Sequence, residues 1–350
     1  MQAGQLPKAG MEMTTDKTLG LPVYWLLFFL ICCGLGYPTL ARFDARQVNV
    51  DAVEYFRLVT DTPSAAGDLL RYRVLVPWVA KPFYWLSQGR IRSWNPVFFG
   101  LLISNSLFTA SGACLLLRIG QKCIGAQGVA FAGTLLYLLD FTIPNRQLGC
   151  GLVDSGESCF MLALFWLLLE RKFFLLPALG LLGAFAKESF VPMSAMATAG
   201  WAICEYRGGR WRLKETIWAL TMVIVGLSTV VVLQWSVAGR LIWPWEFAGS
   251  LRAGDSLLRG LAGCVTDRYF WYTFGWLVPL GVIRLKRLPA AWICAALGGA
   301  AAALAMGAWN SAGGNTVPSV FNSLGPILSL SAAHLLACGE SRVQSSAATH

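Results

Sequence analysis

The sequence is poor in the residues from which histidine- and cysteine-based sites are built. Its 350 residues include only two histidines, His334 and His350. Neither position favours histidine catalysis or a His-ligated metal. Ten cysteines are present, but no Cys-x-x-Cys occurs, which argues against a zinc site and a redox motif. The pattern Asp-x-Asp is missing as well, so no cofactor is assigned, and a divalent metal is left open without being indicated.

Charged residues are also scarce, at 13% of the chain, whereas 56% of the residues are hydrophobic and fall in long runs. Backbone polar groups inside a bilayer must be satisfied within the protein, so such runs form helices. The alternating ten-residue strands typical of a membrane barrel do not occur. The fold class predicted from the sequence is therefore all-α, in a polytopic membrane protein.

The apolar runs predict about ten transmembrane helices. About 20 apolar residues, at about 1.5 Å each, cross a hydrocarbon core of about 30 Å. The predicted spans are 19–40, 96–117, 125–141, a run ending at 169, two short helices within 173–204, and then 216–237, 269–283, 290–309 and 318–338. The two short helices are expected to meet at Lys187-Glu188, because 173–204 is too long for one crossing and short for two.

The long loop after the first span predicts two interfacial helices. Residues 51–59 form a short amphipathic pattern, and 74–86 is rich in tryptophan and tyrosine, which suits the membrane interface. The second pattern is too short for a confident crossing, and Lys81-Pro82 is expected to interrupt it. A third polar loop covers 238–267.

The net charge of +10 arises largely from short basic loops at 118–122, 171–172, 207–214 and 284–287. Such loops are an orientation signal rather than a nucleic-acid site, so both termini are expected in the cytoplasm and the acid-bearing loops outside. The predicted organisation is a cytoplasmic tail (1–18), a membrane module (19–204), a more variable membrane module (205–338) and a second tail (339–350). No nucleic-acid partner is expected.

Acids in the first outer loop are candidates for acid–base chemistry. Asp51 opens the amphipathic segment, and Glu54 and Tyr55 follow one turn later. A carboxylate beside a pocket at a membrane interface can have a raised pKa and act as a base. Asp44 lies closer to the first span, and for this residue an ordinary solvated loop acid is an equal alternative.

Three further charged patterns stand next to apolar spans. Asp154 and Glu157 are spaced to share one helix face, although they could simply stabilise a helix N-terminus. Lys187-Glu188 interrupts an apolar stretch, where charge is costly and usually functional; the alternative is a mutually satisfied pair at a tight turn. Arg71 and Arg73 flank Tyr72 and suit either lipid head groups or a lipid-linked phosphate.

Together these features resemble the GT-C superfamily of integral-membrane glycosyltransferases, in the form of uncharacterised bacterial members. The resemblance is carried by an acid-bearing first outer loop with an interfacial helix, a second acid after the third span, and a Lys-Glu between the fifth and sixth. The stretches concerned are Asp51-Ala52-Val53-Glu54-Tyr55, Arg71-Tyr72-Arg73-Val74-Leu75-Val76-Pro77-Trp78, Asp154-Ser155-Gly156-Glu157 and Ala186-Lys187-Glu188-Ser189. It covers roughly 19–204 well and the remainder only in architecture.

The resemblance implies transfer of a sugar from a polyprenyl-phosphate donor to a glycan, lipid or protein acceptor, on the outer face of a bacterial inner membrane. Asp51 would be the catalytic base, with Asp44 as the alternative. Lys187, Arg71 and Arg73 would bind the donor phosphate. Supporting or substrate-binding roles would fall to Glu54, Tyr55, Asp154, Glu157 and Glu188, and acceptor recognition chiefly to 238–267.

Two other classes remain open at this level. A flippase or transporter of lipid-linked sugars would also keep charges at membrane depth. It should show broken helices in two related halves, which the sequence does not reveal. A non-catalytic membrane scaffold would tolerate loss of the acids.

Overall fold

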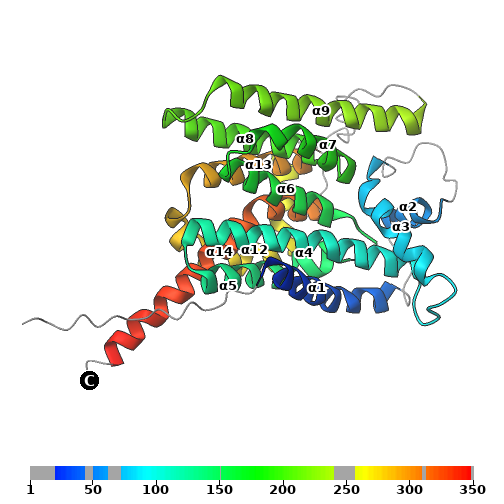
Figure 1. Ribbon diagram of the computed structural model, residues 1–350, viewed down its shortest axis with the longest axis horizontal. Coiled ribbons are helices and arrows are strands. Elements are labelled where there is room, and N and C mark those ends of the chain that lie inside the picture. The colour runs from blue at the N-terminus through cyan, green and yellow to red at the C-terminus, as the bar shows by residue number, and fades with distance from the viewer. Residues whose placement is uncertain are drawn as a thin grey trace, which may run out of the picture.

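The computed structural model describes residues 20–43, 50–61, 72–149, 151–239, 257–309 and 313–347. Every regular element within these residues is helical, and none of them forms a strand. The predicted all-α class is therefore confirmed for the described part of the chain. The helices run roughly parallel to one another across Figure 1 and form one elongated bundle.

The helices follow the predicted order, with one difference: α11 lies within 238–267, which was predicted as a polar loop. They are α1 (Leu21–Phe43), α2 (Val50–Thr60), α3 (Leu75–Ser87), α4 (Pro96–Ile124), α5 (Gln127–Leu139), a π-helical turn η2 (Ile143–Gln147), α6 (Asp154–Leu169), η3 (Phe173–Leu175), α7 (Leu176–Ala186), α8 (Phe190–Arg207), α9 (Leu213–Ala238), α11 (Leu257–Thr266), α12 (Arg268–Arg284), η5 (Leu285–Arg287), α13 (Ala290–Trp309) and α14 (Gly313–Ala347).

Five described helices are long and apolar enough to cross a membrane. These candidate spans are Leu21–Leu40, Pro96–Ile124, Leu213–Ser236, Ala290–Trp309 and Thr316–Ala337. They identify the chain as a multi-pass membrane protein. The other predicted crossings correspond to helices that are shorter or more polar, such as α6 with 16 residues and α7 with 11. About ten crossings therefore stays a prediction.

The break between α7 and α8 lies at the predicted position. Helix α7 ends at Ala186, and Lys187 adopts an extended backbone, with φ −165° and ψ 135°. Helix α8 begins at Phe190. A side chain at Gly183 would collide with the ring of Phe190, 2.2 Å from an ideal Cβ, so the two helices meet closely only because this residue is glycine.

Both segments predicted as interfacial helices are helical, as α2 and α3, and their place at a membrane interface stays a prediction. Helix α3 differs from the prediction in one respect: it continues without interruption through Lys81 and Pro82 to Ser87. Proline removes only one backbone donor, and it stands here in a helix that packs along α4 and α2, which offsets that loss. Helices α2 and α3 lie at the right end of Figure 1.

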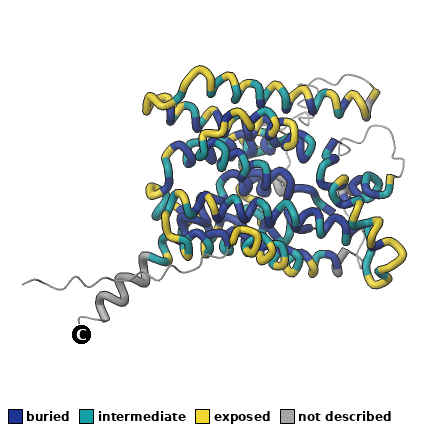
Figure 2. The backbone as a smooth tube through the Cα atoms, in the orientation of Figure 1, coloured by how far each residue is buried: buried dark blue, intermediate teal, exposed yellow. Residues whose placement is uncertain are grey.

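The core of the bundle is formed around α4, α6, α13 and α14, whose inward residues are dark in Figure 2. Trp292, Phe165 and Phe321 are among its largest fully buried side chains. Helix α9, in contrast, leaves apolar residues such as Leu220 and Ile224 exposed along one side, as a helix facing lipid does.

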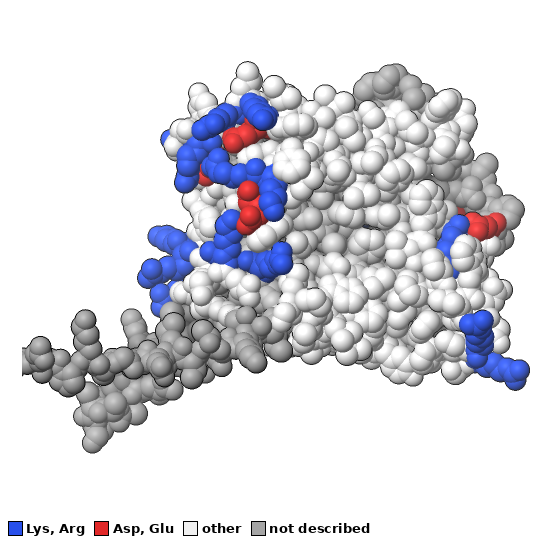
Figure 3. All heavy atoms as spheres, in the orientation of Figure 1, with Lys and Arg blue, Asp and Glu red and all other residues white. Residues whose placement is uncertain are grey.

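Charge is distributed unevenly over the ends of the bundle. Most lysines and arginines visible in Figure 3 gather at the left end, opposite α2 and α3. Residues 118–122, predicted as a loop, instead form the last turns of α4. The basic residues of 171–172, 207–214 and 284–287 lie at the junctions of α6 with η3, α8 with α9, and α12 with η5. The structure therefore has one strongly basic end and one end that carries the short helices α2 and α3.

Candidate functional site

Five charged side chains converge where α6 begins, beneath the end of the bundle that carries α2 and α3. They are Arg73, Asp154, Glu157, Lys187 and Glu188. They come from three separate segments: the residues before α3, the first turn of α6 and the α7–α8 turn. The convergence matches the grouping of these residues as candidates from the sequence.

Lys187 binds both carboxylates of α6. Its Nζ lies 2.7 Å from Asp154 Oδ1 and 3.1 Å from Glu157 Oε2. Burial of the ammonium group opposes its charge, but the two carboxylates outweigh that effect and raise the pKa of Lys187. The lysine is therefore a charged, closely paired group.

Glu157 is completely buried and surrounded by donors. Ser189 donates a hydrogen bond to Oε1, while Ser319 and Asn322 donate to Oε2 at 3.1 and 3.0 Å. A buried carboxylate is tolerable only with such a set of partners. Ser319 and Asn322 belong to α14, so this acid ties the last described helix to α6 and the α7–α8 turn.

A chain of polar side chains continues from Glu157 into the bundle. Asn322 accepts a hydrogen bond from Gln147 at 3.1 Å, and Gln147 lies 3.4 Å from the hydroxyl of Tyr137. The hydroxyl oxygen of Tyr137 in turn lies 2.6 Å from Ser158 Oγ. The network links η2, α5, α6 and α14, which holds the charged group in one arrangement.

Arg73 forms the second part of the site. Its Nε and Nη2 donate to the two oxygens of Glu188 at 3.0 and 2.6 Å, and its Nη1 donates to the Tyr55 hydroxyl at 3.2 Å. Burial raises the pKa of Tyr55 to about 12, against an opposing effect of Arg73. Burial would also raise the pKa of Glu188, but Arg73 holds it below its usual range.

The two parts differ in accessibility. The side chains of Arg73 and Glu188 are 19% and 32% exposed, whereas those of Lys187 and Glu157 are 9% and 0% exposed. The arginine pair is therefore the more accessible part of the site. The lysine cluster lies behind it as a closed, fully hydrogen-bonded support.

Lys187 and Glu188 do not form the mutual pair that was one alternative for this motif. Among the described ion pairs, Lys187 binds Asp154 and Glu157, and Glu188 binds Arg73. The extended backbone at Lys187 explains the difference, since successive side chains in extended chain point to opposite sides.

The candidates of the first outer loop are only partly covered. Asp44 and Arg71 lie outside the described residues, and Asp51 is described only as the second residue of α2. Tyr55 follows it by one turn. Glu54 is buried and ion-paired with Arg57, so it supports α2 itself. No position in this loop is assigned a catalytic role by geometry alone.

Several site residues were not predicted from the sequence: Ser189, Ser319, Asn322, Gln147 and Asn105. Asn105 accepts a hydrogen bond from Ser155 at 2.6 Å and donates to the carbonyl oxygen of Leu152 at 3.0 Å, which positions the start of α6. The sequence signal for Asn105 was its position within an apolar span, because a buried side-chain amide in a span needs hydrogen-bond partners. Which partners it has depends on packing.

A metal is not suggested by the arrangement of the described residues, within which no three His, Cys, Asp or Glu side chains form a group able to hold an ion.

Comparison of the chain with protein-family models, with curated protein sequences and with solved structures found no match. What the protein does must therefore be inferred from the residues and geometry of the site.

Proposed function

We propose that the chain is a GT-C-type membrane glycosyltransferase, which moves a sugar from a polyprenyl-phosphate donor to a glycan, lipid or protein acceptor. The observation that carries this proposal is the Arg73–Glu188–Tyr55 group, a reachable arginine at the edge of a buried ionic network beneath two interfacial helices. A lipid-borne phosphate arrives at that depth, and guanidinium is the side chain best suited to bind it.

The donor already carries its leaving group, so the protein needs few chemical devices. An acceptor hydroxyl oxygen attacks the anomeric carbon of the sugar, and the bond from that carbon to the phosphate oxygen breaks. The electron pair stays on the phosphate, whose charge Arg73 stabilises. The hydroxyl proton passes to a carboxylate of the first outer loop, for which we propose Asp51, with Asp44 as the alternative.

The geometry suggests a division of labour among the cations. Arg73 uses three donors on Glu188 and Tyr55, and a guanidinium carries five. Lys187 is already engaged with Asp154, Glu157 and Ser319. We therefore assign the donor phosphate to Arg73 first, together with Arg71, and give Lys187 a mainly supporting role with the two acids of α6.

The proposed site lies on the outer face of a bacterial inner membrane. Support comes from the basic residues at the opposite end of the bundle, which the positive-inside rule assigns to the cytoplasm (Figure 3). Acceptor recognition falls to the outer loops, chiefly 238–267, of which 240–256 lie outside the described residues.

The direct test is transfer of labelled sugar by the purified full chain from a panel of polyprenyl-phosphate sugars. Product that forms only with the protein, and fails with Arg73→Gln, supports the proposal. If no donor in the panel is consumed but a labelled lipid-linked sugar crosses reconstituted vesicles, the protein is a transporter. If the protein shows neither transfer nor transport, the remaining alternative is a non-catalytic membrane scaffold.

A further inference from the structure

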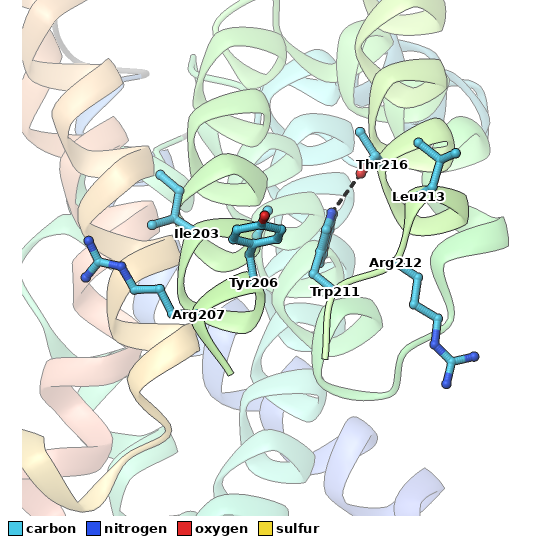
Figure 4. Close-up of a pocket in the computed structure, with 8 residues that line it drawn as sticks. Ile203, Tyr206, Arg207, Trp211, Arg212, Leu213 and Thr216 are labelled. Atoms are coloured by element: carbon cyan, nitrogen blue, oxygen red, sulfur yellow. Dashed lines mark hydrogen bonds between the residues drawn. The ribbon is translucent and has the colours of Figure 1, made fainter. Parts of the chain in front are cut away.

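A pocket lies at the basic end of the bundle, opposite the end that carries α2 and α3. It has a volume of about 540 Å³ and lies between the last turn of α8 and the first turn of α9. Its lining includes Ile203, Tyr206, Arg207, Trp211, Arg212 and Leu213 (Figure 4). Cavities of this size hold small organic ligands or part of a larger one.

The wall formed by Trp211 is fixed in place. Its indole Nε1 donates to Thr216 Oγ1 at 2.8 Å, and its ring meets Phe173 edge-on with centroids 5.5 Å apart. Tyr206 stands opposite as a second ring (Figure 4). The pocket is therefore bounded by an ordered aromatic surface and not by loose loop residues.

The two arginines that line the pocket differ from nearby arginines in their ion pairs. Arg171 and Arg210 both pair with Glu205. The side chains of Arg207 and Arg212, in contrast, form no ion pair among the described residues, although the backbone N–H of Arg212 donates to Glu215 at 2.9 Å. Their guanidinium groups point away from each other on opposite flanks of the two rings in Figure 4. Their charge is available for an anion.

Exposed apolar side chains line the same pocket. Ile203, Tyr206 and Leu213 are 59%, 74% and 77% exposed, which is unusual for large apolar side chains unless lipid covers them. Ile217 and Leu220 continue the exposed apolar row along α9. Apolar contact and uncompensated positive charge therefore meet within one pocket.

We propose that this pocket binds an anionic phospholipid of the cytoplasmic leaflet. Its acyl chain would lie along Ile203 and Leu213, its glycerol region against the rings of Tyr206 and Trp211, and its phosphate in the positive field of the two arginines that flank the pocket. A small soluble phosphate would leave the apolar row without a role, and an uncharged lipid would leave the arginines without one. Each basic residue near an anionic surface strengthens binding by about fivefold.

The experiment titrates the purified full chain in neutral detergent with fluorescent phosphatidylglycerol and with fluorescent phosphatidylcholine. Wild type should prefer the anionic lipid, and the double variant Arg207→Gln/Arg212→Gln should bind it about 25-fold more weakly. The matched control, Arg284→Gln/Arg287→Gln, removes the same charge from the neighbouring basic loop and should change affinity less than about twofold. Tyr206→Ser/Leu213→Ser, at exposed positions, should weaken both lipids.

Three results would overturn the proposal. Equal loss in the two arginine double variants would show a general attraction to the basic end. Equal binding of the two lipids would remove the role of charge. Full competition by glycerol phosphate would identify a soluble ligand instead. Unchanged thermal unfolding of each variant checks that it is folded.

Discussion

Arg73 and Glu188 are 115 residues apart in the chain, yet their side chains are joined by two hydrogen bonds, of 3.0 and 2.6 Å. This fork-to-fork pair connects the segment before α3 with the turn between α7 and α8. It is the more accessible part of a charged group that is otherwise closed. The proposed function depends on this pair, because a donor phosphate would share the same guanidinium.

Replacement of Arg73 by lysine should therefore weaken donor binding about tenfold or more, since an ammonium keeps the charge but cannot form the paired bonds. The measurement is the affinity of the purified variant for a polyprenyl-phosphate sugar. Arg90→Lys, at the exposed turn after α3, is the matched control and should bind normally. Normal donor affinity in Arg73→Lys would place the phosphate elsewhere.

Stability should depend on pH through Glu188. Because Arg73 lowers its pKa below the usual 4.5, the pair stabilises the fold fully above that pH, and the contribution is lost as the pH falls below it. Glu188→Gln should thus lower the thermal midpoint at neutral pH, with a difference from wild type that shrinks below pH 4.5. A difference that is constant or grows on acidification contradicts this origin.

Lys187→Met should destabilise the protein strongly, by about 3–5 kcal/mol, because it leaves two carboxylates buried without their cation. Thermal unfolding in detergent measures the effect. Adding Asp154→Asn and Glu157→Gln to the same chain should restore part of the lost stability. If Lys187→Met unfolds like wild type but loses donor binding, the lysine contacts the donor directly, as the sequence motif alone suggests.

The orientation can be tested with two exposed basic positions at opposite ends of the bundle. In a background without reactive native cysteines, Arg90→Cys should react with a membrane-impermeant maleimide on intact cells, because it lies beside the interfacial helices. Lys286→Cys, in a basic loop, should react only after permeabilisation. The reverse pattern would turn the proposed site toward the cytoplasm.

Much of the architecture could be predicted from the sequence because hydrophobic runs and their breaks are local signals. The α7–α8 break was placed by a charged pair within an apolar stretch, and α2 by its amphipathic pattern. Pro82 was misleading: its ring ends many helices, but here packing keeps α3 continuous.

The partners within the site could not be predicted in the same way. Asp154 and Lys187 were both candidates, but their contact joins positions 33 residues apart and depends on how α6 meets the α7–α8 turn. Asn322 reaches Glu157 across 165 residues. Adjacent residues were equally uninformative, since the extended backbone at Lys187 directs Lys187 and Glu188 to different partners.

The central claim is most directly tested by sugar transfer from a labelled polyprenyl-phosphate donor by wild type, Asp51→Asn and Asp44→Asn, all normally inserted and matched for donor affinity. Loss of a general base typically costs about 10²–10⁴-fold in rate. The account predicts such a fall for Asp51→Asn, with a smaller loss for Asp44→Asn. The opposite order would move the base to Asp44, and wild-type rates in both variants would contradict a catalytic carboxylate in the first outer loop.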